Sequence, residues 1–198
     1  MKNSTYPQMK IIKTNRCILR PATLEDANDM FEYYSQSKVV KYLPMQKHNT
    51  IADTKRFIKT FFLSNYKKGN IGHFAVVFKE NSKTIGNVGF NNITSTSKEG
   101  EIGICINPKY WGLDLSSELA LAMLRYGFED LNLQKIIAIT FEDNNYSRKS
   151  LEKLGFNYLG VFKKNLHSSI SSLVTCHKYE MSQEYYFKRL NKKYKRND

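Results

Sequence analysis

The chain has 198 residues, of which 41% are hydrophobic and 25% are charged, and these values are ordinary for a globular protein. This length suits one domain, or one domain with a tail, and is enough to bury a substantial core. No apolar run approaches the ~20 residues of a membrane-spanning helix, and the N-terminus lacks the apolar segment of a signal peptide. We therefore expect a cytoplasmic protein without a membrane partner.

The formal net charge is +13. An excess of this size favours acidic partners, such as nucleotide phosphates, RNA, the ribosome or an acidic protein surface. The alternative is a lysine-rich composition, of the kind that an AT-biased genome encodes, spread over an ordinary surface. The basic residues crowd only at the C-terminus, where we expect a solvated, frayed end: Lys188, Arg189, Lys192, Lys193, Lys195 and Arg196.

The three cysteines are odd in number, widely spaced and without metal-ligand spacing: Cys17, Cys105 and Cys176. Such usage indicates a reducing compartment and packing thiols, with no metal site.

In chain order, residues 1–13 are expected to form a loose lead-in, and residues 16–20 alternate as a strand that stops at Pro21. Two helices follow, each begun by a threonine with an aspartate three residues later: Thr23 with Asp26, and Thr50 with Asp53. Strands are then predicted over 73–79, 84–91 and 101–106, the first two of them as a hairpin.

A helix is expected to run from the loop 107–118 through residue 131. The continuous apolar run 135–141 predicts a strand buried on both faces. A short helix over 147–154 closes at a C′ glycine, Gly155, and strands over 156–162 and 173–181 complete the chain. The order β-α-α-β-β-β-α-β-α-β-β, without repeat or linker, predicts one mixed α/β domain.

The loop 107–118 is the most informative stretch, because it joins a strand to the start of a helix. Free backbone N–H groups and the helix dipole make such a junction an anion site. It therefore predicts a phosphorylated cofactor.

Several motifs occur in order with consistent spacing: 14–21 (TNRCILRP), 101–103 (EIG), Trp111-Gly112, 144–147 (NNYS) and 151–156 (LEKLGF). With these motifs the chain resembles the GNAT superfamily of acyl-CoA-dependent N-acyltransferases, and within it the ribosomal-protein N-terminal acetyltransferases. The resemblance implies a mixed α/β (α+β) fold: a central, mostly antiparallel twisted sheet of about seven strands, splayed between the fourth and fifth, with flanking helices. It covers residues 14–182 as the catalytic domain, and leaves 183–198 as a basic helix end and tail.

The resemblance also implies acetyl-CoA as cosubstrate and assigns its contacts. The strand backbone at 104–106 would pair with the pantetheine arm and polarise the thioester carbonyl. The loop would hold the pyrophosphate, Asn144 would touch the arm, and the Ser147 hydroxyl would protonate the departing thiolate. The implied cofactor-binding residues are Ile104, Cys105, Ile106, Trp111, Gly112, Leu113, Asp114, Leu115, Ser116, Ser117, Asn144 and Ser147.

Asp114 departs from the family pattern, which has glycine there. Aspartate tolerates the required positive φ better than most residues, but a carboxylate ~5 Å from the pyrophosphate would cost roughly 1–3 kcal/mol of binding. The alternative, which we favour, is that Asp114 caps the helix with its carboxylate turned away.

Glu101 is the candidate general base, acting through water on the incoming amine, although it equally fits a rim carboxylate paired with a lysine. Asn144 and Ser147 also fit a chain turn and a helix cap. The tyrosine that serves as acid in many relatives is replaced by Leu151. The glutamate used by some members of this branch aligns with Leu166 or His167, so neither assignment carries over.

We expect an N-acetyltransferase whose acceptor is a primary amine. An α-amine with pKa ~7.7–8 is partly neutral near pH 7, whereas lysine at ~10.4 is not, so a protein N-terminus is favoured. Acetylation of a polyamine or antibiotic amine is one alternative, and the basic segment 33–50, expected as a wall of the cleft, counts against a polycation. Another is a degenerate, weakly CoA-binding module associated with RNA or the ribosome. Both monomer and homodimer are compatible with the sequence.

Overall fold

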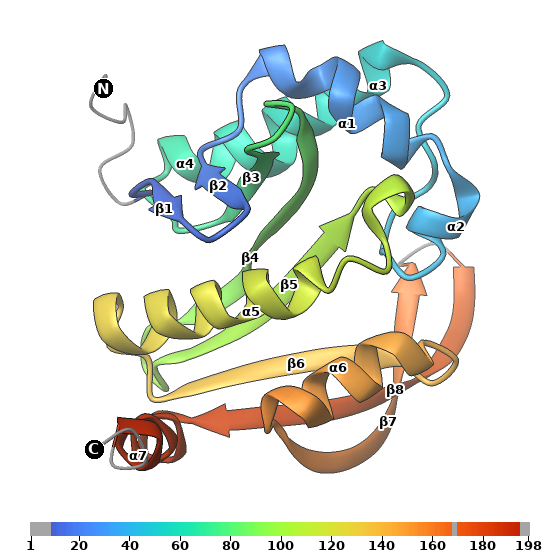
Figure 1. Cartoon of the computed structure of the whole chain (residues 1–198). Coiled ribbons are helices and arrows are strands. Elements are labelled where there is room, and N and C mark those ends of the chain that lie inside the picture. The colour runs from blue at the N-terminus through green and yellow to red at the C-terminus, as the bar shows by residue number, and fades with distance from the viewer. Residues whose placement is uncertain (1–8, 168–169, 195–198) are drawn as a thin grey trace.

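The computed structural model describes residues 9–167 and 170–194, and in that part eight strands form one twisted sheet in the order β1-β2-β3-β4-β5-β6-β8-β7 (Figure 1). The strands are β1 (Ile12–Lys13), β2 (Cys17–Arg20), β3 (His73–Phe78), β4 (Thr84–Thr94), β5 (Glu99–Ile106), β6 (Lys135–Phe141), β7 (Asn157–His167) and β8 (Ile170–Ser182). The predicted fold class is confirmed. The additional strand is β1, which pairs with β2. It lies inside the segment 1–13, for which a loose lead-in is expected.

The sheet forks between β5 and β6. These two strands pair in parallel only from Glu99 opposite Lys135 to Ile102 opposite Ala138. Beyond Ile102, β5 continues alongside β4 while β6 continues alongside β8, so the strands diverge (Figure 1). The predicted splay between the fourth and fifth strands is therefore present.

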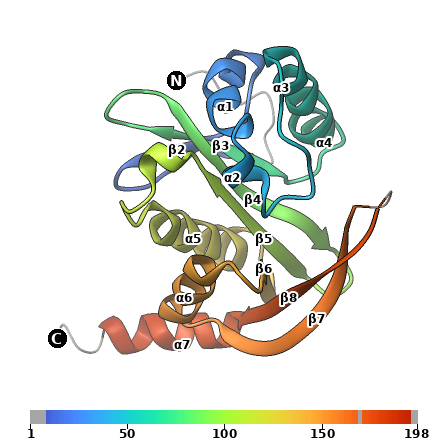
Figure 2. The same cartoon turned by 90° about the vertical axis from the view of Figure 1, so that its right-hand side faces the viewer.

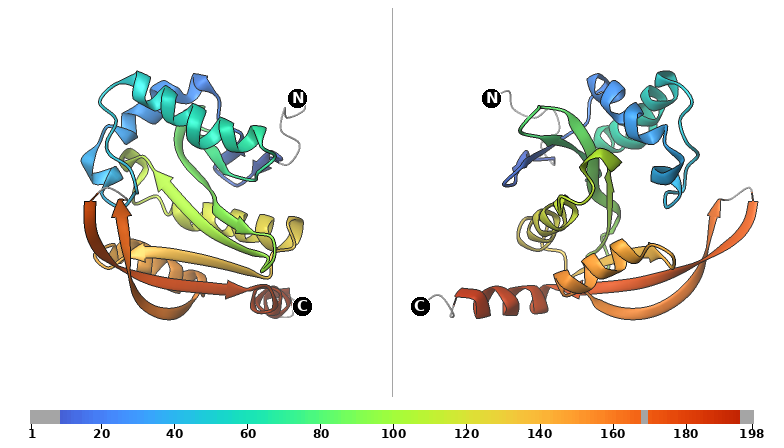
Figure 3. Two further views of the ribbon diagram at one scale, coloured as in Figure 1. Left: turned by 180° about the vertical axis from the view of Figure 1, so that it is seen from behind. Right: turned by 45° about the vertical axis from the view of Figure 1, so that its right-hand side comes forward.

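Helices cover both faces of the sheet (Figure 2). On one face lie α1 (Ala27–Tyr34) and a continuous run of α3 (Ile51–Phe57), a π-helical segment (Ile58–Leu63) and α4 (Ser64–Lys67). On the other lie α5 (Leu115–Arg125), which continues as a π-helical turn (Tyr126–Asp130), and α6 (Asn145–Leu154). The short helix α2 (Ser37–Val40) lies on the side toward which the β7–β8 hairpin curves (Figure 3), and α7 (Gln183–Tyr194) follows β8.

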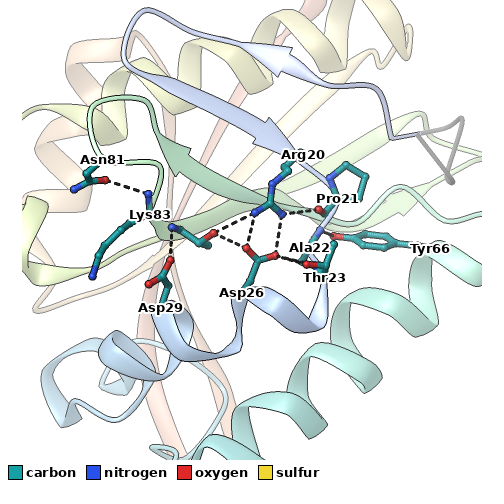
Figure 4. A network of polar contacts seen from close by, with 10 residues as sticks. Arg20, Pro21, Ala22, Thr23, Asp26, Asp29, Tyr66, Asn81 and Lys83 are labelled. Carbon is teal, nitrogen blue, oxygen red and sulfur yellow. Dashed lines mark hydrogen bonds and ion pairs between the residues drawn. The ribbon is translucent and has the colours of Figure 1, made fainter. Parts of the chain in front are cut away.

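The position of α1 is fixed by an ion pair with a buried carboxylate. Arg20 at the end of β2 donates to both carboxylate oxygens of Asp26, at 2.8 and 2.6 Å, and Thr84 at the start of β4 donates to the same group (Figure 4). Burial alone would raise the pKa of Asp26, but the hydrogen bonds from Arg20 and Thr84 outweigh it and lower that pKa. This network holds the start of α1 against two strands, and so determines where its last residues, Tyr33 and Tyr34, are buried in the core.

Two expectations are corrected. The β6 strand is not buried on both faces: Ile136, Ala138 and Thr140 are buried, whereas the alternate residues are half-buried. The basic C-terminus is a docked helix over its described residues, because Tyr186 is buried and the Arg189 guanidinium donates to the carbonyl of Leu154 at the end of α6. The remaining basic residues Lys195 and Arg196 lie outside the described residues.

None of the helices in the described ranges combines the length and apolarity needed to cross a bilayer.

Candidate active site

The fork exposes one edge of β5. Because β6 leaves after Ile102, the backbone groups of Ile104, Cys105 and Ile106 that point toward β6 have no strand partner there. An unpaired strand edge can accept an extended chain with amide groups by main-chain hydrogen bonding. Burial raises the pKa of the Cys105 thiol to about 12, so this cysteine contributes its backbone and no nucleophile.

The loop after β5 is folded back onto the end of that strand. The indole Nε1 of Trp111 donates to the carbonyl of Ile106 at 2.8 Å, while the ring itself is 53% exposed. The ammonium of Lys38, from α2, lies 5.7 Å from the centre of the indole ring. Trp111 therefore joins the end of β5 to the α2 side of the molecule.

Two residues of this loop have left-handed backbone conformations, Gly112 with φ 82° and Asp114 with φ 53°. Asp114 is the N-cap residue of α5, as predicted, but its side chain makes no hydrogen bond to the helix backbone. The carboxylate instead accepts a hydrogen bond from the Ser117 hydroxyl at 2.6 Å and lies 3.5 Å from the Lys153 ammonium of α6. The first N–H groups of α5 thus remain available to an anion.

Arg16, which directly precedes β2, binds the loop after β5 and the first turn of α5. Its Nη1 donates to the carbonyl of Leu113, and its Nε and backbone N–H donate to the two carboxylate oxygens of Glu118, each at 2.7 Å. No local sequence pattern predicts this role of Arg16, since 102 residues separate it from Glu118. Leu115 is buried beneath the loop.

The first turn of α6 lies beside the first turn of α5. Asn144 is its N-cap and accepts a hydrogen bond from the backbone N–H of Ser147 at 3.2 Å. Ser147 is therefore inside the helix, and the expectation that it caps the helix is wrong. The Tyr146 hydroxyl lies 3.5 Å from the Ser116 hydroxyl, so Tyr146 joins the two helix starts, a role that we did not predict.

Glu101 lies at the point where the strands diverge, opposite Ile137 of β6. Its Oε1 accepts a hydrogen bond from Asn91 Nδ2 at 2.8 Å. Within residues 9–167 and 170–194 no lysine or arginine pairs with Glu101, and no hydrogen bond reaches its Oε2. The alternative of a lysine-paired rim carboxylate is therefore not seen.

The segment expected as a wall of the cleft does approach the β6–α6 loop. Lys41 pairs with Asp143 at 2.6 Å, and the Tyr42 ring lies 5.7 Å from that of Phe141 at the end of β6. Three family positions remain to be placed. Leu151 is buried in the core, and Leu166 and His167 belong to β7 instead of a loop, with side chains outside the described part.

The arrangement combines three features: an open strand edge, a helix start with free N–H groups, and a carboxylate at the fork. The first two suit an extended amide-bearing arm that ends in phosphates, and the third can accept a proton. Across the described residues no group of three or more His, Cys, Asp or Glu side chains is placed to hold a metal ion.

Comparison with known proteins agrees with this geometry. Residues 16–157 match the family model for the acetyltransferase (GNAT) domain. The uncharacterized N-acetyltransferase YnaD of Bacillus subtilis is 34% identical over 154 residues, which are 77% of this chain and 86% of YnaD.

Two more distant relatives have names that state a substrate. The spermidine N(1)-acetyltransferase of Escherichia coli is 25% identical over 142 residues, 72% of this chain and 73% of that enzyme. The structure of the ribosomal-protein-S5-alanine acetyltransferase of Vibrio fischeri superposes with a TM-score of 0.73 at 22% identity, over 88% of this chain and 97% of the other.

Proposed function

This chain belongs to the GNAT acetyltransferase family, and on that premise we propose that it transfers the acetyl group of acetyl-CoA to an α-amino group of a protein or peptide. The amine nitrogen attacks the thioester carbonyl carbon, the carbon–sulfur bond breaks, and CoA leaves as the thiolate. The N–H groups of β5 near Cys105 and Ile106 would stabilise the oxyanion, and the first turn of α5 would hold the pyrophosphate. The Ser147 hydroxyl would supply the proton to the thiolate.

The position of the Glu101 carboxylate is the observation that carries this proposal. Its carboxylate stands at the end of the β5–β6 pairing with one oxygen held by Asn91. The other oxygen is left to take a proton from the amine, directly or through a water molecule. A carboxylate is a weak base, so it suits an amine that is already partly neutral near pH 7, as an α-amine is. The likeness to a ribosomal-protein-S5-alanine acetyltransferase supports the same choice at the level of the fold.

A polyamine is the second candidate, and the relation to spermidine N(1)-acetyltransferase favours it. A polycation needs unpaired acids in its site in addition to the base. In the described part of the chain, however, Asp143 at the α2 wall is already paired with Lys41, and Glu32 of α1 is paired with Lys109. The net charge of +13 also repels a polycation over the distances at which it is steered.

The test is an acceptor comparison with acetyl-CoA as donor. One tetrapeptide would carry a free α-amine, a second would be blocked at its N-terminus and contain one lysine, and spermidine would be the third acceptor. Acetylation would be located by mass spectrometry. We expect the free α-amine to react at least ~10-fold faster than the lysine, in line with its lower pKa. A preference for spermidine would move the assignment to a polyamine.

A further inference from the structure

A line of hydrogen bonds runs from Glu101 into the core. Asn91 contacts Glu101, His73 contacts Asn91 at 2.8 Å, Asn87 contacts the other ring nitrogen of His73 at 2.8 Å, and Tyr34 contacts Asn87 at 2.7 Å. Tyr34, Asn87 and His73 are each at most 5% exposed. We call these four residues, with Glu101, the Tyr34–Glu101 chain.

Strand alternation brings the chain together on one face of the sheet. Asn87 and Asn91 lie four residues apart on β4, with Gly89 between them, and both side chains reach the His73 ring, so they share a face. Gly89 pairs with His73 of β3 on one side and with Gly103 of β5 on the other.

The missing side chain of Gly103 makes room for the chain. A Cβ there would lie 2.8 Å from Asn91 Oδ1 and 3.0 Å from His73 Cε1. On its remaining side, the imidazole meets the ring of Phe61 edge-on at 5.2 Å between ring centres. The groups packed around His73 are thus neutral, with Glu101 as the nearest charge in the chain.

Each hydrogen bond in the chain has a definite direction. The Asn87 amide nitrogen can only donate, so His73 Nδ1 accepts and the hydrogen of the neutral ring is on Nε2. Nε2 then donates to Asn91 Oδ1, which leaves the Asn91 amide nitrogen to donate to Glu101. The Tyr34 hydroxyl completes the series by donating to Asn87 Oδ1. All four donors therefore point toward the carboxylate.

We propose that Tyr34, Asn87, His73 and Asn91 are positioning residues for Glu101, which fix one of its oxygens as a hydrogen-bond acceptor and orient the other toward the amine. This inference rests on the proposed function, in which Glu101 is the base. The Tyr34–Glu101 chain is not a proton relay, because an asparagine side chain does not transfer a proton. Each asparagine only orients its neighbours through hydrogen bonds. A run of aligned donors strengthens each hydrogen bond in turn.

The tautomer of His73 can be read without any assay of activity. In ¹⁵N NMR spectra of the full-length protein, we expect the hydrogen of His73 on Nε2 at pH 7. Asn87→Asp replaces the donor with an acceptor of the same shape, so Nδ1 should then carry a hydrogen. A wild-type ring with its hydrogen on Nδ1 would overturn the proposal.

Kinetics tests the effect on Glu101. With acetyl-CoA and the free-amine tetrapeptide, Asn91→Ala should lower kcat about 5- to 20-fold at pH 7, a part of the 10²–10⁴ that a positioned base supplies. The KM for acetyl-CoA should stay the same. Tyr34→Phe should lower kcat about 2- to 5-fold, because it removes the hydrogen bond to Asn87 at the buried end of the Tyr34–Glu101 chain. Tyr186→Phe is the matched control, since it also removes a hydrogen bond from a buried tyrosine to another side chain, Glu129 at 2.7 Å, outside the Tyr34–Glu101 chain, and kcat should not change.

A double variant separates positioning from mere folding. If Asn91 acts through Glu101, then Asn91→Ala added to Glu101→Gln should cause no further loss of kcat. Losses that multiply would show that Asn91 supports the structure independently and would overturn the proposal. If Glu101→Gln alone has no effect, the base assignment fails. If Glu101→Gln is impaired while Asn91→Ala is not, only the positioning chain fails.

Discussion

Asp114 Oδ1 accepts a hydrogen bond from Ser117 Oγ at 2.6 Å, and this contact turns the acid of the loop 107–118 toward its own helix. Lys153 approaches the other oxygen at 3.5 Å. The hydrogen bond from Ser117, followed by the charge of Lys153, lowers the pKa of Asp114, so the carboxylate is ionised at neutral pH. The loop therefore carries a negative charge together with a lysine that offsets it.

Replacing Asp114 with glycine should leave the free energy of unfolding nearly unchanged and should tighten CoA binding. At φ 53° glycine avoids the ~1 kcal/mol that a side chain costs in this region, which offsets the lost hydrogen bond from Ser117. The freed Lys153 should tighten CoA binding about 3- to 10-fold at low salt, and less at high salt. Calorimetric titration at two ionic strengths, with denaturant unfolding, measures both quantities.

Lys153→Ala is the matched control for this experiment, because it leaves Asp114 with an unopposed charge. It should weaken CoA binding. An unchanged affinity in both variants would mean that neither charge acts on the pyrophosphate.

Acetyl-CoA should raise the melting temperature of the protein. A ligand that binds only the folded state at 100 times its Kd adds about 2.7 kcal/mol to the unfolding free energy, which is ~5–10 °C for a chain of this size. Scanning fluorimetry with 1 mM acetyl-CoA measures the shift, and a dephospho analogue reports the contribution of the phosphate that it lacks. No shift would contradict the binding site at β5 and α5.

Glu101→Gln should keep CoA affinity and lower kcat by ~10²-fold or more at pH 7. As the pH rises through roughly 8, the α-amine loses its proton without help, so the defect should shrink. Glu99→Gln on the same strand is the control, because Glu99 faces Lys135 at 3.6 Å and has no part in the proposed chemistry. A pH–rate profile of unchanged shape in the Glu101 variant would remove this residue from the base role.

Ser147→Ala should slow transfer by a factor that is the same for every acceptor, because the hydroxyl acts on the departing thiolate. Ser150→Ala, one turn further along α6, should have no effect. The comparison requires kcat for two amines of different pKa with each variant. A defect that depends on the amine would contradict the assignment.

Stability should fall in mild acid because of His73. Burial lowers the pKa of this imidazole from 6.5 to about 4, so between these values the unfolded chain binds a proton that the folded protein does not. The unfolding free energy therefore decreases as the pH falls below about 6.5 and levels off below about 4, a loss of up to roughly 3 kcal/mol.

Urea unfolding at pH 7 and pH 4.5 measures this loss, and His73→Gln should show a smaller one. The remainder includes His48, whose pKa burial also lowers. If the variant does not fold, ¹³C NMR of the wild-type ring gives the same information: a His73 signal that titrates near pH 6.5 would contradict the prediction.

Local features of this fold could be predicted from the sequence, whereas features that depend on strand register could not. Positive φ at Asp114 was predictable from the glycine that the family pattern has there, and the splay of the sheet was expected from the resemblance to the GNAT superfamily. The start of α6 was not, because Asn144 and Ser147 are both good N-caps and only packing selects the first. Arg16 with Glu118, and His73 between two asparagines, meet because of the order and register of the strands, which no local pattern specifies.

The short parallel pairing of β5 with β6 makes the closed end of the fork a joint between two arms of the molecule. The first arm runs from β1 to the end of the π-helical turn after α5, and the second contains β6, α6, β7, β8 and α7. At the joint, Gln183 donates to the carbonyl of Phe128 at 3.1 Å and Tyr186 donates to Glu129 at 2.7 Å, whereas the open end is bridged by exposed pairs such as Lys41 with Asp143. A ligand bound between the arms would add contacts at the open end of the fork. That end lies farthest from the joint, so these contacts oppose separation of the arms most strongly. Occupancy of the fork would then resist hinge opening and slow amide hydrogen exchange even in β7, the edge strand that lies two strands beyond β6.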